Sequence, residues 1–247
     1  MTLHSHPKTL KFLFSCNLIV CLTISSVAFA AYTPKNPSRP STATGTTGVR
    51  TACGEAAKGM LTALAPLGHV GQTIATHPTF AWYIPDTRSY PIRFSLYSYG
   101  SNGKPILQHR NLLERAEDTK GIRIYTLPKD QTSLIAGQKY LWQVEILCAF
   151  NDPSKNKMAV AEVEVVAMPT LLQSSLARTS DRTKRANLYA ESGFWYDALA
   201  EALEDDKAKL SSIALLKDLI KLEAPNSLEA VQKQSDRLKQ VIELEQQ

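Results

Sequence analysis

The hydrophobic period of this chain changes near residue 170, and that change limits the folds that the chain can adopt. Between Cys53 and Pro169, apolar and polar residues alternate in short runs separated by turn residues. Such alternation is typical of half-buried β-strands. From Leu171 onward, apolar residues recur every three or four positions, which is the helical period. We therefore expect a β-rich α+β protein with a β-region at 53–169 and helices at 170–247.

The turn spacing in the first region favours a β-sandwich over a parallel sheet, because no long helical segment separates the strands. Two aromatic strands, Pro78-x-Phe80-x-Trp82 and Gly137-x-x-Tyr140-x-Trp142, resemble the immunoglobulin and fibronectin type III plan. Core packing is the expected role of these aromatic residues. The strands are expected at Thr79–Ile84, Ile92–Tyr99, Ile106–Gln108, Gly121–Leu127, Lys139–Cys148 and Met158–Met168.

Four helical segments are expected in the second region. The first ends at Ser192-Gly193, and Trp195 then lies on the apolar face of the next. Asn226, three residues before Glu229, predicts a capping box for the last helix, which is expected to turn Leu228 inward. The segments are Arg178–Glu191, Phe194–Lys209, Leu210–Glu223 and a last helix after Pro225.

The first 30 residues have the three-part plan of a secretory signal peptide. Lys8 and Lys11 precede an apolar run that ends in Ala28-Phe29-Ala30, with small residues at the positions that signal peptidase reads. We expect cleavage after Ala30 and no membrane span in the processed chain; an uncleaved anchor is the alternative. Residues 31–52 are rich in Pro, Ser, Thr and Gly, which predicts a disordered linker.

Cleavage removes Cys16 and Cys21 and leaves Cys53 and Cys148 as a single pair. In an oxidising compartment such a pair predicts a disulfide. A reactive thiol pair or a metal site is less favoured, because the chain has no C-x-x-C sequence and no His beside either Cys.

The sequence contains no recognisable catalytic, cofactor or metal motif. His69, His77 and His109 lack the spacing of a preformed metal site, and neither a nucleophile elbow nor a phosphate-binding loop occurs. The net charge of +5 is too small and too dispersed to indicate a nucleic-acid binder. No catalytic, metal or cofactor-binding residue is therefore predicted.

Three spaced motifs carry a resemblance to a known family. The segments His77–Pro85, Gly137–Trp142 and Gly193–Leu199 are similar to DUF928, and the resemblance runs from about Arg50 to Ala200. It implies an exported cyanobacterial protein with a sandwich followed by helices, and it implies no activity.

Three hypotheses for function follow. The first is a non-enzymatic binding or structural module of the periplasm or cell envelope, with an envelope protein or polysaccharide as partner. The second is a hydrolase on envelope polymers whose site is assembled from loops. The third is a carbohydrate-binding module, which requires exposed coplanar aromatic rings among Tyr83, Tyr90, Tyr97 and Tyr99.

Overall fold

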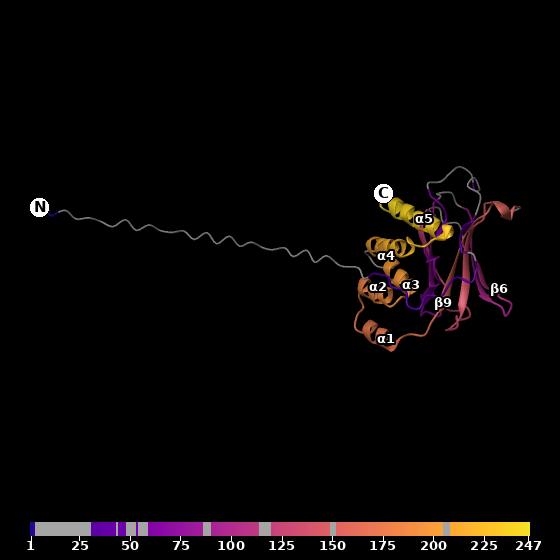
Figure 1. Cartoon of the computed structure of the whole chain (residues 1–247), viewed down its shortest axis with the longest axis horizontal. Helices are drawn as coiled ribbons and strands as arrows, with labels where there is room; N and C mark the ends of the chain where they lie inside the picture. The colour runs from indigo at the N-terminus through magenta and orange to yellow at the C-terminus, as the bar shows by residue number, and fades with distance from the viewer. Residues whose placement is uncertain are drawn as a thin grey trace.

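The structure, a computed structural model, describes residues 1–2, 31–42, 44–47, 53, 59–85, 90–113, 120–148, 152–204 and 208–247. The expected signal peptide lies outside these residues except for its first two. The described part is an α+β fold in which helices, a three-stranded sheet and a six-stranded sheet follow one another as layers (Figure 1).

The strands are β1 (Gly45–Thr47), β2 (Thr62–Ala63), β3 (Gly71–Thr73), β4 (Thr79–Ile84), β5 (Ile92–Tyr99), β6 (Pro105–Leu113), β7 (Gly121–Thr126), β8 (Lys139–Ile146) and β9 (Lys157–Val165). The large sheet has the order β1-β9-β8-β5-β6, with β3 also paired to β9, and the small sheet has the order β2-β4-β7. Every pairing is antiparallel except that of β3 with β9. The strands β4 and β5 have the bounds predicted from the alternation.

The core lies between the two sheets and is aromatic. The ring of Phe80 on β4 lies 5.1 Å from that of Phe94 on β5 and 5.3 Å from that of Trp142 on β8. All five aromatic residues expected in the core are buried, and these are Phe80, Trp82, Tyr140, Trp142 and Trp195.

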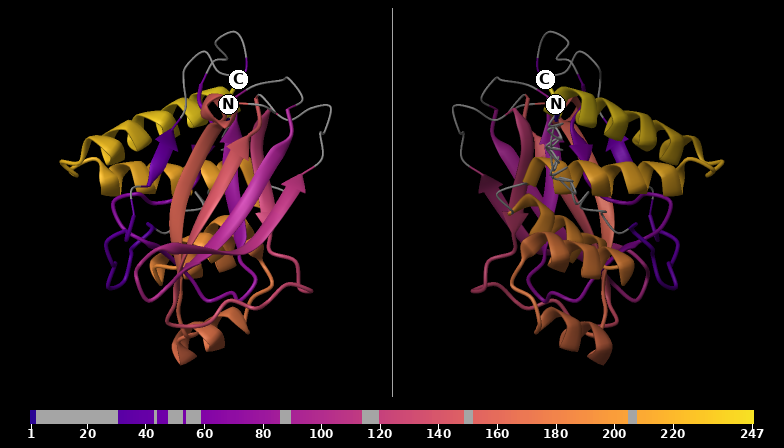
Figure 2. Two further views of the ribbon diagram at one scale, coloured as in Figure 1. Left: turned by 90° about the vertical axis from the view of Figure 1, so that its right-hand side faces the viewer. Right: turned by 90° about the vertical axis from the view of Figure 1, so that its left-hand side faces the viewer.

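The helices are α1 (Thr170–Leu176), α2 (Arg182–Glu191), α3 (Trp195–Leu203), α4 (Ala208–Glu223) and α5 (Glu229–Glu245), with a short 3-10 turn, η1 (Pro153–Lys155), before β9. They lie on the side of the three-stranded sheet (Figure 2, right). Two hydrogen bonds fix them there, from Trp195 Nε1 to the carbonyl oxygen of Leu64 at 2.9 Å and from Gln234 Nε2 to that of Ala63 at 2.7 Å.

One side chain of the helical layer enters the space between the sheets. The Tyr196 hydroxyl accepts a hydrogen bond from Trp142 Nε1 at 2.8 Å and donates one to the carbonyl oxygen of Glu162 at 2.8 Å. Its ring passes so close to Gly71 that a Cβ there would lie 2.8 Å from the ring. Glycine is therefore required at position 71 for α3 to dock on β3.

The start of α5 differs from the expected capping box. Leu228 is the N-cap residue of α5 and has no side-chain cap, while Asn226 Oδ1 accepts from the backbone N–H of Leu228 in a turn before the helix. Leu228 is exposed and does not face the core. The physical reason is that a short Asx turn uses the Asn226 side chain locally and leaves it unavailable for a cap three residues later.

The described residues of the expected linker also differ from the prediction. Residues 31–42, which we call the amino-terminal strap, lie along the folded body, and β1 pairs with β9. Tyr32 is buried, and the backbone N–H groups of Ser41 and Thr42 donate to Glu162 Oε1 at 2.8 and 2.9 Å. A segment with few apolar residues is ordered here because its backbone donors find carboxylate acceptors on other elements.

The predicted disulfide is confirmed. Cys53 and Cys148 are bonded, with their Cα atoms 4.7 Å apart, and the bridge spans 95 positions of the chain. None of the described helices has both the length and the apolar character that crossing a membrane demands.

Candidate functional site

Among the residues that the structure describes, no helix covers the outer surface of the six-stranded sheet (Figure 2, left). Residues directly opposite one another in antiparallel pairs share a face, so the strand register identifies the side chains on this surface. We call this surface the open face. Its residues are Leu107, Arg110 and Leu112 on β6, Arg93, Ser95 and Tyr97 on β5, Leu141, Gln143 and Glu145 on β8, and Met158, Val160 and Glu162 on β9. Ser95, Leu141, Glu145, Val160 and Glu162 are buried, so the most exposed part of this face lies along β6.

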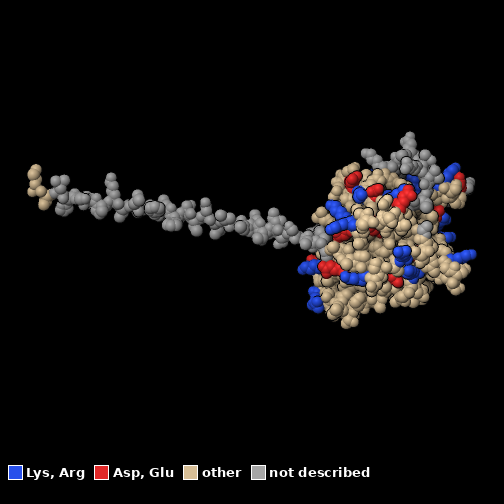
Figure 3. All heavy atoms as spheres, viewed as in Figure 1, with Lys and Arg blue, Asp and Glu red and all other residues tan. Residues whose placement is uncertain are grey.

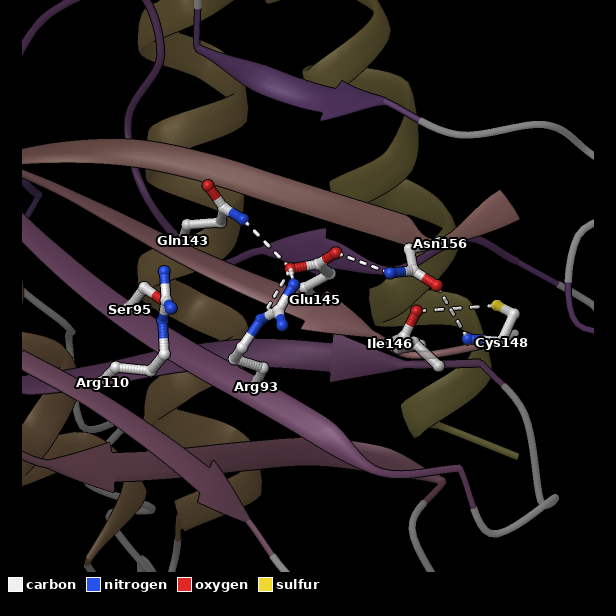
Figure 4. Close-up of polar contacts among 8 residues, drawn as sticks. All are labelled: Arg93, Ser95, Arg110, Gln143, Glu145, Ile146, Cys148 and Asn156. Carbon is white, nitrogen blue, oxygen red and sulfur yellow. Dashed lines mark hydrogen bonds and ion pairs between the residues drawn. The ribbon is translucent and has the colours of Figure 1, made fainter. Parts of the chain in front are cut away.

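An ion pair lies on β5 and β8 of the open face, near one end of these strands (Figure 4). Glu145 Oε2 accepts from Arg93 Nε at 3.0 Å and from a terminal guanidinium nitrogen of Arg93 at 2.5 Å. Gln143 Nε2 donates to the same oxygen at 3.3 Å. The side chain of Glu145 is only 8% exposed and that of Arg93 is 33% exposed. The pair therefore holds the Arg93 guanidinium in one position while one side of it stays in contact with solvent.

The ion pair is connected to the disulfide by one asparagine. Asn156 Nδ2 donates to Glu145 Oε1 at 2.7 Å, and Asn156 Oδ1 accepts from the backbone N–H of Cys148 at 3.1 Å. Both carboxylate oxygens of Glu145 are thus occupied, by Arg93 and Gln143 on one side and by Asn156 on the other.

The edge of the open face combines an arginine with exposed leucines. Arg110 is exposed, its Nε lies 3.4 Å from Ser95 Oγ, and it forms no ion pair with any residue that the structure describes. Leu107 and Leu112 are 44% and 59% exposed. Arginine beside accessible apolar surface is typical of protein interaction sites.

Among the described residues, β6 pairs only with β5, so its other backbone edge is free. A long edge strand with apolar side chains can accept a strand from a partner. On the side of the molecule shown in Figure 3, positive and negative side chains are interspersed. In its described part, that side therefore presents no patch of a single charge that would favour a partner of opposite charge.

The four tyrosines considered for a carbohydrate platform lie in different environments. Tyr83 is buried beneath the helices, and the Tyr90 hydroxyl donates to the carbonyl oxygen of Cys53 at 2.8 Å. The Tyr99 hydroxyl donates to Glu162 Oε1 at 2.6 Å, and burial together with this bond raises the pKa of Tyr99. Tyr97 is half-buried on the open face, next to Leu107 and Leu141. Only Tyr97 and Tyr99 are therefore placed to meet a ligand on this surface.

One histidine lines a small pocket, and a second bonds the loop beside it. His109 lines this pocket of about 110 Å³ and bonds Tyr125 Oη at 2.7 Å and Gln131 Oε1 at 3.1 Å. His77 Nε2 lies 3.2 Å from the carbonyl oxygen of Gln131. Both rings thus hold the loop that carries Gln131 against the strands.

A second, open hollow of about 670 Å³ lies between the amino-terminal strap and the α4–α5 turn, with Arg39 and Leu228 at its rim. The residues that line these two hollows include no Asp or Glu. In the part of the chain that the structure describes, no three His, Cys, Asp or Glu residues gather in a way that could hold a metal ion.

The remaining buried ionisable groups tie layers together. His69 Nε2 lies 3.0 Å from the Tyr32 hydroxyl, and burial lowers the pKa of His69 to about 4. Asp197 accepts from the backbone N–H of Ile74 at 3.1 Å, and burial raises its pKa to about 7. Glu223 accepts from the N–H groups of Leu67 and Gly68, and burial raises its pKa to about 6.

These observations define a protein with two packed β-sheets, a carboxyl-terminal helical layer and one open sheet face. A family model described as Domain of Unknown Function (DUF928) matches residues 44–235, and the chain belongs to this family. The comparison with curated proteins found no match.

Of the open-face residues, only Tyr97 is a candidate on the sequence alone. Their signal was the alternation itself, because Arg93, Ser95 and Tyr97 alternate with the apolar residues of the same strand. The alternation predicts that one face is polar, but it does not predict which side chains meet across strands, because that depends on the strand order and register.

Proposed function

We propose that this protein is an exported, non-enzymatic binding module of the periplasm or cell envelope, and that the open face with the β6 edge is its contact surface. The observation that carries the proposal is the pairing of exposed Leu107, Leu112 and Arg110 with an arginine held in place by a buried carboxylate. The helices cover the opposite side (Figure 2), and the exposed side chains of β6 are the part of this face that a partner can reach.

Export is supported by the amino-terminal plan of residues 1–30 and by the disulfide, because disulfides persist in oxidising compartments. The resemblance to DUF928 adds a cyanobacterial origin to this proposal.

We also propose that the two sheets are a variant of the immunoglobulin and fibronectin type III sandwich. The strand order supports this, since β2, β4 and β7 form one sheet and β5, β6, β8 and β9 the other. That plan distributes its strands A, B and E against C, C′, F and G in the same way. The strands β1 and β3 are additions along β9.

The experiment compares two exposed leucines on different elements, Leu112 on β6 and Leu171 on α1. Leu112→Glu changes the open face, and Leu171→Glu changes α1, where Leu171 is 85% exposed. Cosedimentation of the purified protein with isolated envelopes should fall at least about tenfold for Leu112→Glu, because burying a charge at an apolar contact is strongly unfavourable. It should not change for Leu171→Glu. Equal binding by both variants, or turnover of an envelope polysaccharide or peptide by the protein, would contradict the proposal.

Tyr97 favours carbohydrate as a second candidate ligand class. Its half-buried ring lies on the open face between Leu107 and Leu141, and an aromatic ring with one accessible side can stack on a sugar. Tyr97→Ala should then abolish retention on immobilised envelope polysaccharide without a change in thermal stability, and Tyr97→Phe should retain binding. Unchanged retention of Tyr97→Ala would leave a protein partner as the favoured one.

A further inference from the structure

The amino-terminal strap is anchored at its second residue. The Tyr32 ring is buried, lies 5.0 Å from the Trp195 ring in an edge contact, and has its hydroxyl 3.0 Å from His69 Nε2. Ala31, directly before it, is exposed. The residue that would follow the predicted cleavage site is therefore held at the surface of the helical layer.

Backbone contacts fix the path of the chain at this point. The N–H of Thr33 donates to the carbonyl oxygen of Ala190 at 3.0 Å. A Cβ on Gly193 would lie 2.7 Å from the backbone nitrogen of Lys35, so the strap passes directly over the end of α2. The position of Tyr32 is thus determined from both sides.

A carboxylate on α4 lies beside this anchor. Asp218 Oδ2 accepts from the backbone N–H of Tyr32 at 3.3 Å, and burial raises the pKa of Asp218. Asp218 forms no ion pair with any described residue. The positive charge of Lys221, on the same helix, acts on Asp218 electrostatically and lowers its pKa somewhat. The Ala31 nitrogen is one residue before the Tyr32 nitrogen that bonds this carboxylate. Successive Cα atoms are only about 3.8 Å apart, so a small movement of the chain end can bring the Ala31 nitrogen to Asp218.

We propose that Asp218 is the binding site for the amino terminus created by cleavage after Ala30. Hydrolysis of the Ala30–Ala31 bond consumes one water and leaves a carboxylate on Ala30 and an amine on Ala31, which takes a proton from solvent. In the uncleaved chain the same nitrogen is a neutral amide. The inference rests on the export and processing proposed above.

Cleavage after Ala30 and binding of the amino-terminal strap to the folded body are then linked. The far end of the strap donates to Glu162 on β9 through Ser41 and Thr42, while its start contacts α2, α3 and α4. An ion pair at the start therefore stabilises a segment that joins the helical layer to the six-stranded sheet.

A double-mutant cycle tests the ion pair. One protein begins at Ala31, a second carries a short Gly-Ser extension before Ala31, and each is made with Asp218 and with Asp218→Asn. Asparagine keeps an oxygen that can accept from Tyr32, so the substitution removes the charge and preserves the neutral bond. Asp218→Asn should lower Tm by about 2–4 °C in the protein that begins at Ala31. It should lower Tm by clearly less in the extended protein.

Two controls accompany the cycle. Asp236→Asn on α5 removes an exposed carboxylate paired only with Lys239 among the described residues, and it should have the same small effect in both backgrounds. Asp218→Glu should restore part of the coupling. Equal Tm losses for Asp218→Asn in the two backgrounds would overturn the proposal.

A direct readout is the pKa of the Ala31 amine by NMR, which should lie above its usual value of about 7.7–8.0. The other ionisable groups around the anchor are Lys221 on α4, Glu223 at its end, His69, Tyr32 and Tyr196. An unshifted amine pKa contradicts the ion pair.

Amino-terminal sequencing of the exported protein separates the two proposals. A terminus other than Ala31 would overturn the processing step and with it the role of Asp218 in the native protein. A terminus at Ala31 with no coupling in the cycle would overturn the ion pair alone.

Discussion

Trp142 and Tyr196 join the helical layer to the six-stranded sheet through one line of hydrogen bonds. The indole N–H of Trp142 donates to the Tyr196 hydroxyl, which in turn donates to the carbonyl oxygen of Glu162. All of these groups are buried. A buried donor that loses its acceptor costs more free energy than the bond itself contributes. The stability of the fold should therefore depend on the hydroxyl oxygen of Tyr196.

The first prediction concerns that atom. Tyr196→Phe removes the hydroxyl and leaves the Trp142 indole N–H without an acceptor. The free energy of unfolding should fall by about 1–3 kcal/mol, measured by urea denaturation. Tyr97→Phe is the control at a half-buried ring and should change the value by less than about 0.5 kcal/mol. Equal stability of Tyr196→Phe and wild type would show that the bond line contributes nothing.

The second prediction concerns the buried carboxyl of Asp197. Burial raises its pKa to about 7 in the folded protein, against 3.8 for the free side chain. Between these values the folded state binds the extra proton, so stability is lost as pH rises from about 4 through 7. The stability difference between Asp197→Asn and wild type should therefore change over this window and become constant above it. A constant difference from pH 4 to 8 would contradict the shift.

At this scale the sequence predicted the aromatic residues of the core, because large apolar rings at alternating strand positions are stabilised by burial on one face of the sheet. It did not predict their polar partners. The contacts of Tyr196 with Trp142 and of Asn156 with Glu145 join residues from different elements, and no local pattern encodes them.

Among the elements, the amino-terminal strap departs most from the sequence-based expectation. Its composition is that of a linker, yet one buried ring and a few backbone hydrogen bonds to Glu162, Asp218 and Ala190 hold it in place. Composition measures how much apolar surface a segment can bury by itself. Composition gives no information on hydrogen-bond acceptors that other elements place beside the segment in the folded protein.

The third prediction concerns the strap. Tyr32→Ala removes the ring between His69 and Trp195 and should lower the free energy of unfolding by about 3–5 kcal/mol, the usual range for truncating a large buried ring. Limited proteolysis should then cut within residues 31–42. A strap that resists protease in Tyr32→Ala would show that its other contacts are sufficient.

The fourth prediction concerns the covalent bridge. Replacing both Cys53 and Cys148 by Ser opens a loop of 95 positions, for which the chain-entropy model gives a loss of up to about 4–5 kcal/mol. Denaturation of the oxidised protein and of the double variant measures this loss, and non-reducing peptide mass spectrometry checks the bond in the exported protein. Free thiols there would contradict the assignment.

For the whole molecule, the helices cover one side of a two-sheet body and leave the other side open. The change of period near residue 170 predicted the two regions and their order. It could not predict which sheet the helices cover, because that depends on long-range contacts such as Trp195 with Leu64. The location of the open face follows from that docking.

Hydrogen exchange in isolated envelopes and in the purified protein tests the open face as a binding surface most directly. If a partner binds there, amides of β6 and β5 should exchange more slowly in the envelope sample, and the protection should be lost in Leu112→Glu. The helices should exchange alike in both samples. Protection confined to the helical layer, or no protection at all, would contradict the account.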